Sequence, residues 1–242
     1  MTSPSPAERL LDDLEITEPD EIDVEVIAWA VGARVRYRPL PRGDARIVGM
    51  GERAIITVDD RASRVRQRFS VAHELGHWHH HRGQRLICHG GSVDAEADAC
   101  EREADRYAAD LLIPRSMLMP RVADAPISFA LVERTARRFG VSTLAAALRL
   151  ADVHPGKFAL IVTEPDGRRW FRRSPALPKG WRVRVDTPDF QSRTHPPSDP
   201  DAMQHVLAYY HLLGRGLRGL LVSRETVQLR SGQMLMIINA VS

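Results

Sequence analysis

The sequence predicts an α+β protein, and three patterns along its 242 residues support that class. Apolar and polar residues alternate in short segments between residues 33 and 58, as in half-buried strands. Apolar residues then recur at intervals of three and four from about residue 64 to residue 150, as in amphipathic helices. Beyond residue 156 the alternating pattern returns.

The first block is expected to hold one helix and three strands. Their ranges are 21–31 for the helix and 33–37, 46–48 and 54–58 for the strands. Gly32 suits the end of the helix because glycine tolerates the left-handed conformation of a C-terminal cap. Asp59 and Asp60 close the strands, and either is a candidate to cap the next helix.

The middle of the chain is expected to be helical. One long helix is predicted over residues 64–81, and a second over residues 93–112 ends before Pro114. A third helical region spans residues 127–150 and breaks at Gly140, which predicts helix, turn, helix.

After Pro155 and Gly156 we expect a small β-rich segment. Strands are predicted over residues 158–162, 168–172, 181–185, 217–222 and 234–241, a short apolar segment over 207–213, and a loop over 187–200.

The composition is that of a globular protein, with 43% hydrophobic and 27% charged residues. There is no secretory signal and no apolar run long enough to span a bilayer, so we expect a cytoplasmic protein without a membrane partner. Cys88 and Cys100 fit a reducing compartment. They are expected to be small buried residues, and the alternative is metal ligation or redox sensing.

The net charge is +3, but the charged residues are unevenly distributed along the chain. Between Glu8 and Glu25 nine acidic residues accompany one basic residue, Arg9, whereas the segment after Gly156 has thirteen basic and seven acidic residues. A basic segment can contact nucleic acid or an acidic partner, but it is more often a solvated surface.

The central motif is His73-Glu74-Leu75-Gly76-His77 within the long predicted helix. Residues four apart on a helix differ by about 40° in direction, so the two histidines face the same way and can bind one metal ion. Glu74 is turned about 100° from His73, which suits a general base acting on water rather than a ligand. The pattern is the H-E-x-x-H motif of metallopeptidases. The alternative is a buried histidine pair without a metal.

A catalytic metal site needs a third protein ligand. His81 lies about 12 Å along the helix from His73, too far to share one ion with it. Glu101 and Glu103 in the second helix flank its apolar stripe on opposite sides, so helical geometry leaves both open.

Two segments together resemble the ImmA/IrrE family of metallopeptidases, over about residues 20–150. They are residues 66–77, RQRFSVAHELGH, and residues 103–114, EADRYAADLLIP. The resemblance implies a gluzincin-like core of a three-stranded sheet and helices. It also implies zinc, or another divalent ion such as manganese, bound by two histidines and one glutamate. Similarity to the family's Glu-Ala-Asn/Asp segment indicates Glu103 as the third ligand, with Glu101 as the alternative.

The resemblance also implies a function. Family members cleave DNA-binding repressors of the helix-turn-helix type and so release stress-response or mobile-element genes. Some carry a small C-terminal sensory domain that resembles a GAF fold. The expected division is a flexible N-terminus (1–20), a metallopeptidase domain (21–123), a helix-turn-helix-like region (124–154) and a small C-terminal α/β domain (155–242) that is β-rich and GAF-like.

We therefore expect a metallo-endopeptidase in which Glu74 transfers the proton of metal-activated water. The extra histidines or Tyr107 are candidates to stabilise the oxyanion. The competing hypothesis is a DNA-binding regulator that uses residues 127–150. Its second helix offers little besides Ser142, Thr143 and Arg149 to base edges, so direct nucleic-acid binding is not expected. A purely structural metal module is disfavoured because it has no use for Glu74.

Overall fold

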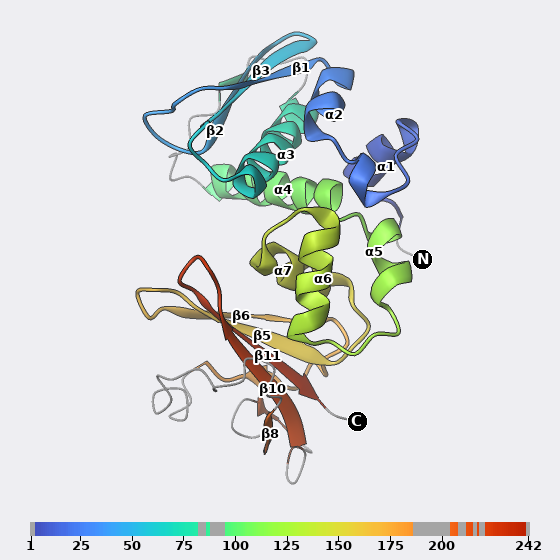
Figure 1. Cartoon of the computed structure of the whole chain (residues 1–242), viewed down its shortest axis with the longest axis vertical. Helices are drawn as coiled ribbons and strands as arrows, with labels where there is room; N and C mark the ends of the chain where they lie inside the picture. Colours follow the sequence, from blue (N-terminus) through green and yellow to red (C-terminus); the bar gives the residue numbers. More distant parts are fainter. Residues whose placement is uncertain are drawn as a thin grey trace. The chain divides into compact units, whose positions relative to one another are not determined.

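The computed structural model of the chain describes residues 3–81, 86–87, 95–185, 204–207, 212–214, 217 and 221–240. Helices and largely antiparallel sheets confirm the predicted α+β class (Figure 1). The chain divides into two compact units, Met1–Leu118 with Arg137–Ser142, and Met119–Ala136 with Thr143–Ser242. No helix in the described part of the chain is both long and apolar enough to cross a membrane.

The first unit combines a small sheet with helices. Its strands are β1 (Ala33–Tyr37), β2 (Ala45–Met50), β3 (Arg53–Val58) and β4 (Leu86–Ile87). Its helices are α1 (Pro6–Asp13), the 3-10 helix η1 (Pro19–Glu21), α2 (Val24–Ala30), α3 (Arg64–His81) and α4 (Ala95–Leu112), and α5 (Arg115–Val122) begins in it.

The N-terminal segment expected to be flexible contains α1. Ser5 and Glu8 form a reciprocal capping box, with the Glu8 amide 3.2 Å from Ser5 Oγ and the Ser5 amide 3.0 Å from Glu8 Oε2. Ala7 and Leu11 are buried, and Glu8 also accepts a hydrogen bond from the amide of Ser116. The segment thus contains a capped and partly buried helix that was not predicted, although the Ser-Pro-x-Glu pattern signals it.

The sheet has the strand order β1-β3-β2-β4. β1 runs parallel to β3, and the other neighbours are antiparallel. The three predicted strands are present, and the two-residue β4 was not predicted. β2 and β3 direct Ile47, Ile56 and other buried residues toward α3, while alternate residues point to the opposite face.

α3 follows the predicted range, 64–81, but its N-terminal cap differs from the prediction. The hydroxyl of Ser63 accepts a hydrogen bond from the Arg66 amide at 3.3 Å, so Ser63 caps the helix. Asp59 instead accepts hydrogen bonds from the backbone and guanidinium of Arg61. The prediction of Asp59 or Asp60 was wrong because the N-cap residue immediately precedes the helix, whereas both acids lie several residues before Arg64.

α3 is fixed to the sheet by Trp78. The indole is 1% exposed, and its N–H donates to the carbonyl of Val31 at 2.9 Å. The ring lies on Gly49 of β2, where a Cβ atom would come within 2.5 Å of Trp78 Cζ3. Glycine is therefore needed at residue 49 because the indole occupies the space of its missing side chain.

The second unit places two helices against an antiparallel sheet. The helices are α6 (Phe129–Phe139), most of which belongs to this unit, and α7 (Thr143–Val153). The sheet has the order β6-β5-β11-β10-β8, with β5 (Phe158–Thr163), β6 (Arg169–Arg173), β8 (Gln204–Leu207), β10 (Leu221–Gln228) and β11 (Met234–Ala240). A separate pair joins β7 (Arg182–Val183) and β9 (Leu212–Leu213).

Strand alternation gives this sheet two apolar faces. A core on one face joins Ala159 and Ile161 of β5 to Met236 and Ile238 of β11, with loop residues such as Leu177 packed against them. The residues between them, such as Leu160 and Ile237, are also buried and belong to the opposite face. The sheet is thus buried on both sides, which explains the nearly continuous apolar runs of β5 and β11.

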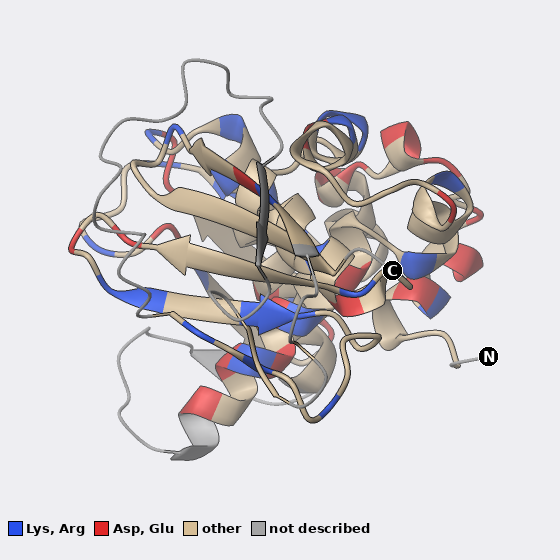
Figure 2. Cartoon of the chain, turned by 90° about the horizontal axis from the view of Figure 1, so that it is seen from below, with Lys and Arg blue, Asp and Glu red and all other residues tan. Residues whose placement is uncertain are grey.

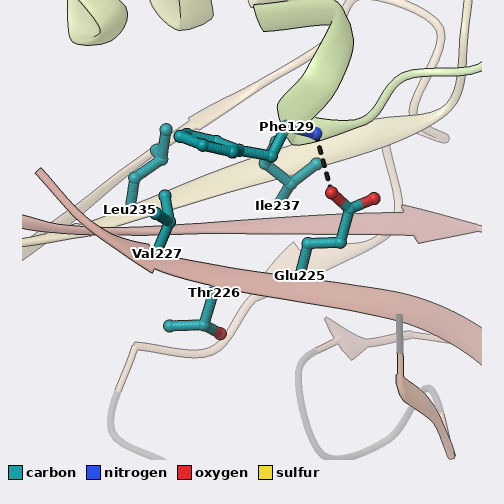
Figure 3. Close-up of a pocket in the computed structure, with 6 residues that line it drawn as sticks. All are labelled: Phe129, Glu225, Thr226, Val227, Leu235 and Ile237. Carbon is teal, nitrogen blue, oxygen red and sulfur yellow. Dashed lines mark hydrogen bonds between the residues drawn. The ribbon is translucent and has the colours of Figure 1, made fainter. Parts of the chain in front are cut away.

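A buried carboxylate ties the start of α6 to the sheet. Glu225 Oε2 accepts a hydrogen bond of 2.7 Å from the amide of Phe129, the first residue of the helix (Figure 3). Nearby, the side-chain amide of Asn239 donates to the carbonyl of Ile127 at 2.9 Å. Phe129 and Glu225 lie beside a shallow hollow over β10 and β11, also lined by Thr226, Val227, Leu235 and Ile237 (Figure 3).

The predicted helix break at Gly140 agrees with the end of α6 and the start of α7. The predicted strands agree with β5, β6 and β11 to within a few residues; they are 158–162, 168–172 and 234–241. The strand predicted over 217–222 is displaced, because β10 begins at Leu221 and ends at Gln228. The loop predicted over 187–200 lies outside the described residues. The proposed boundaries after residues 20, 123 and 154 and the GAF-like character of the last domain stay predictions.

We expect Gly49→Ala to destabilise the first unit by about 1–3 kcal/mol, because the new methyl group would overlap the buried Trp78 ring. Thermal unfolding followed by circular dichroism measures the loss. Gly180→Ala is the matched control, since nothing lies within 4 Å of a Cβ atom at residue 180. Equal melting temperatures for the two variants would contradict the packing role of Gly49.

Candidate metal centre

The site lies where α3 packs against α4. A Cβ atom at Gly76 would lie 2.8 Å from Ala104 Cα and 3.1 Å from Tyr107 Cβ. The two helices therefore approach this closely because residue 76 is glycine and has no Cβ atom. This close approach brings one side of α4 within reach of the two motif histidines.

His73 and His77 converge as the motif predicts. Their Nε2 atoms are 3.1 Å apart, and their ring centroids are 4.8 Å apart. Glu101 of α4 completes the group, with one carboxylate oxygen 3.2 Å from His73 Nε2 and the other 3.4 Å from His77 Nε2. His77 is 3% exposed, and Glu101 lies at the open side of the cluster with 52% of its side chain exposed.

Glu103, the third ligand indicated by the resemblance, is not part of this group. Its nearest ion-pair partner is His80, at 3.9 Å, and its side chain is 57% exposed. Glu101 and Glu103 are about 200° apart around α4, so only one of them can face His73 and His77. We therefore propose Glu101, the alternative left open by the sequence, rather than Glu103 as the third candidate ligand.

The three side chains fit a divalent metal ion. Their ligand atoms all lie within 4.8 Å of one another. A tetrahedral zinc site with bonds of about 2.0–2.1 Å has ligand atoms about 3.3 Å apart, close to the separations given above. Two imidazole nitrogens and one carboxylate are also a ligand set that catalytic zinc sites use.

Asp105 orients the first histidine. Its carboxylate is 2.9 Å from His73 Nδ1, which leaves Nε2 directed toward His77 and Glu101. Burial alone would lower the pKa of His73, but the hydrogen bond and charge of Asp105, with Glu74 and Glu101, outweigh it and raise the pKa. Carboxylates in this position fix the ring and strengthen metal binding.

Asp105 was not predicted from the sequence. A signal was available, because residues 101 and 105 are four apart and face the same side of α4. What the sequence left undetermined was which side of α4 faces α3.

Cys100 is not part of the ligand group. Its Sγ atom lies 4.0 Å from His77 Nδ1, a weak contact of a half-buried thiol. Cys88 lies outside the described residues.

Glu74 is buried beside the cluster. It is 6% exposed, and its Oε2 atom has no hydrogen-bond partner among the described residues. Burial raises the pKa of Glu74 to about 7, against the opposing influence of His73, and Glu101 adds to the rise. A carboxyl group whose pKa lies near neutrality can both accept and release a proton.

The side chains that were candidates to stabilise the oxyanion have other contacts. Tyr107 packs against Gly76 and is 6% exposed, and burial raises its pKa to about 12. His79 stacks on it at 5.3 Å, so both side chains are engaged with each other. His80 pairs with Glu103.

Comparison with known families agrees with this geometry. A profile of the IrrE N-terminal-like domain, of the Peptidase_M78 family, matches residues 28–151, just over half of the chain. The chain belongs to this family. The match includes α3 and α4, and it supports a metallopeptidase-type function that acts on protein.

One curated relative and one solved structure are informative. The Bacillus subtilis (strain 168) protein called "Uncharacterized protein YqaB" is 29% identical over 145 residues, which cover 60% of this chain and 79% of that protein. A solved structure described as a "Mycobacterium tuberculosis transcriptional regulator" superposes with a TM-score of 0.59. It covers 97% of this chain and 86% of its own, and its 14% sequence identity makes this a similarity of fold.

Glu101→Ala should remove most of the bound metal, whereas Glu103→Ala should leave it nearly unchanged. The reason is that only Glu101 lies beside both histidines. Both residues are exposed and on the same helix, so each variant controls for the folding effect of the other. Elemental analysis of the purified variants measures the metal content, and loss of metal from Glu103→Ala alone would restore Glu103 as the ligand.

Asp105→Asn should weaken metal binding about 10- to 100-fold, because the charged partner that orients His73 is lost. Competition with a chelator of known affinity measures the change. Glu103→Gln removes a similar charge from the same helix and should bind metal as the natural protein does. Identical affinities for Asp105→Asn and Glu103→Gln would show that Asp105 has no positioning role.

Proposed function

We propose that this protein is a zinc-dependent endopeptidase in which His73, His77 and Glu101 bind the metal and Glu74 is the general base. The observation that carries the proposal is the convergence of three ligand atoms next to a buried carboxylate with an unpartnered oxygen. A structural metal site would not need such a carboxylate, which costs free energy to bury.

The positions of the side chains support the proposed catalytic roles. Bound zinc would supply Lewis acidity, which lowers the pKa of water and polarises a peptide carbonyl. Asp105 keeps His73 Nδ1 hydrogen-bonded, so the imidazole presents Nε2 to the ligand cluster. Glu74 takes a proton from the attacking water on a carboxylate oxygen and donates it to the nitrogen of the departing amine.

We further propose that the substrate is a helix-turn-helix repressor, cut at one site in a stress-response or mobile-element switch. The support is the family resemblance together with the need for specificity in a protease that meets many proteins. Cleavage that separates the repressor's dimerisation region would release its DNA. Zinc is proposed because of the ligand set, and manganese is the alternative.

A DNA-binding regulator is the second candidate, because the solved structure with the same fold is described as a transcriptional regulator. The burial of α7 weighs against it. Ala146, Ala147, Arg149 and Leu150 are all buried, so the helix that would read bases is packed against its own domain. If the protein shifts the electrophoretic mobility of a DNA duplex at low salt but not at high salt, that result would support DNA binding.

Glu74→Gln should retain metal and fold but reduce cleavage at least about a hundredfold, because it replaces the proton acceptor by a neutral group of the same shape. The assay is incubation of the zinc-loaded protein with the helix-turn-helix repressor encoded nearest to it in its genome, followed by mass analysis of the products. Casein is the control for unspecific proteolysis.

A single cut in the repressor that depends on zinc and Glu74 would support both proposals. An intact repressor with efficient digestion of casein would support the peptidase and reject the repressor as its substrate. Full cleavage by Glu74→Gln would reject Glu74 as the base.

A further inference from the structure

The face of the four-stranded sheet opposite α3 has an apolar centre. Val48, Met50 and Ile55 alternate with buried residues of β2 and β3, and they are 51%, 75% and 43% exposed. Val48 pairs directly with Ile55 across the two strands, and Met50 follows in the next row on the same side. Contiguous exposed apolar side chains with a polar rim can mark an interaction site.

Arginines surround this centre. Register places Arg34 beside Ile55, Arg53 beside Met50, and Arg36 and Arg46 on either side of Thr57. All four are exposed, and the three strands contain no acidic residue. None of the four forms an ion pair with another described residue. We call these residues the arginine-rimmed face: Arg34, Arg36, Arg46, Val48, Met50, Arg53 and Ile55.

The same unit carries a surface of opposite charge around α2. Trp29 is 71% exposed and Val26 is 60% exposed, and they lie three residues apart on one side of the helix. Exposed acids precede and flank them, including Glu21, Asp23 and Glu25. No lysine or arginine occurs between Glu15 and Ala33. The acidic α2 face consists of Glu21, Asp23, Glu25, Val26 and Trp29, and Figure 2 shows acidic residues among the N-terminal helices.

We propose that the arginine-rimmed face of one molecule binds the acidic α2 face of a second copy. Each face has an apolar centre and a charged border, and the borders have opposite signs. Trp29 supplies the kind of large anchor that dominates the energy of binding, while the charged borders provide orientation and specificity. The arginine-rimmed face has no aromatic side chain on which bases would stack, so a protein partner fits it better than single-stranded nucleic acid.

The contact is head-to-tail because it joins two different surfaces. After one contact each molecule keeps a single free face, and the pair together has one free face of each kind, so assembly continues into a ring or a chain unless one face is blocked. None of the residues of either face belongs to the metal cluster. The proposal is therefore independent of the peptidase chemistry.

Two variants of the full chain test the two faces one at a time. Trp29→Lys changes the acidic α2 face, and its high exposure leaves the core intact. Arg34→Glu combined with Arg53→Glu changes the arginine-rimmed face. Arg134→Glu combined with Arg230→Glu is the matched control, since both arginines are exposed, one on α6 and the other in the turn between β10 and β11. Circular dichroism and metal content establish that each variant is folded.

Sedimentation velocity at low and high salt measures association. The natural protein and the control should gain mass as concentration rises at low salt, and each face variant should associate at least about tenfold more weakly. An equimolar mixture of the two face variants should form a one-to-one pair and stop there, because each supplies the face that the other lacks.

A natural protein that stays monomeric at every concentration would overturn the proposal. Face variants that associate like the control would overturn it as well. A mixture that forms no pair would exclude the head-to-tail contact. A short DNA duplex that binds the control but not the Arg34→Glu, Arg53→Glu variant would reassign the arginine-rimmed face to nucleic acid.

Discussion

The site depends on the close approach of α3 and α4 at Gly76. Ala104 and Tyr107 occupy the space in which any side chain at residue 76 would lie. With α4 at this distance, the side chain of Glu101 reaches Nε2 of both histidines, and the shorter side chain of Asp105 reaches Nδ1 of His73. A larger residue would separate the helices, and the ligand atoms would no longer converge. The glycine within the H-E-x-x-H motif thus acts through packing, although it carries no functional group.

The side chains of the site differ in burial, and the difference suits metal-dependent hydrolysis. Glu74 and His77 lie on the inner side of α3 and are almost inaccessible to solvent, whereas Glu101 is half exposed. The buried carboxyl has a raised pKa, and the exposed carboxylate closes the cluster from the solvent side. The sheet supports this arrangement, because Trp78 fixes the C-terminal half of α3 against Gly49 and the carbonyl of Val31.

Much of the fold could be predicted because its elements carry local signals. The strands of the first unit, α3, α4, and the break at Gly140 follow from alternation, helical spacing and glycine. α1 was missed because its eight residues give little periodicity and its capping box was not recognised. β10 was misplaced because its Leu-Val-Ser-Arg-Glu-Thr-Val segment places buried Ser223 and Glu225 among apolar residues, and burial of polar groups depends on partners elsewhere, such as the amide of Phe129.

The sequence by itself predicted the part of the candidate site that lies on α3, the H-E-x-x-H motif. Two histidines four residues apart on a helix must face the same way, and the residue after the first must lie to one side, so His73, His77 and Glu74 needed no tertiary information. The proposed third ligand could not be predicted in this way. Glu101 and Glu103 are equivalent on an isolated helix, and only the rotation of α4 against α3, set by Gly76 and Ala104, decided that Glu101 and Asp105 face the histidines while Glu103 turns toward His80. That rotation results from contacts between residues far apart in the chain, and no local pattern encodes it.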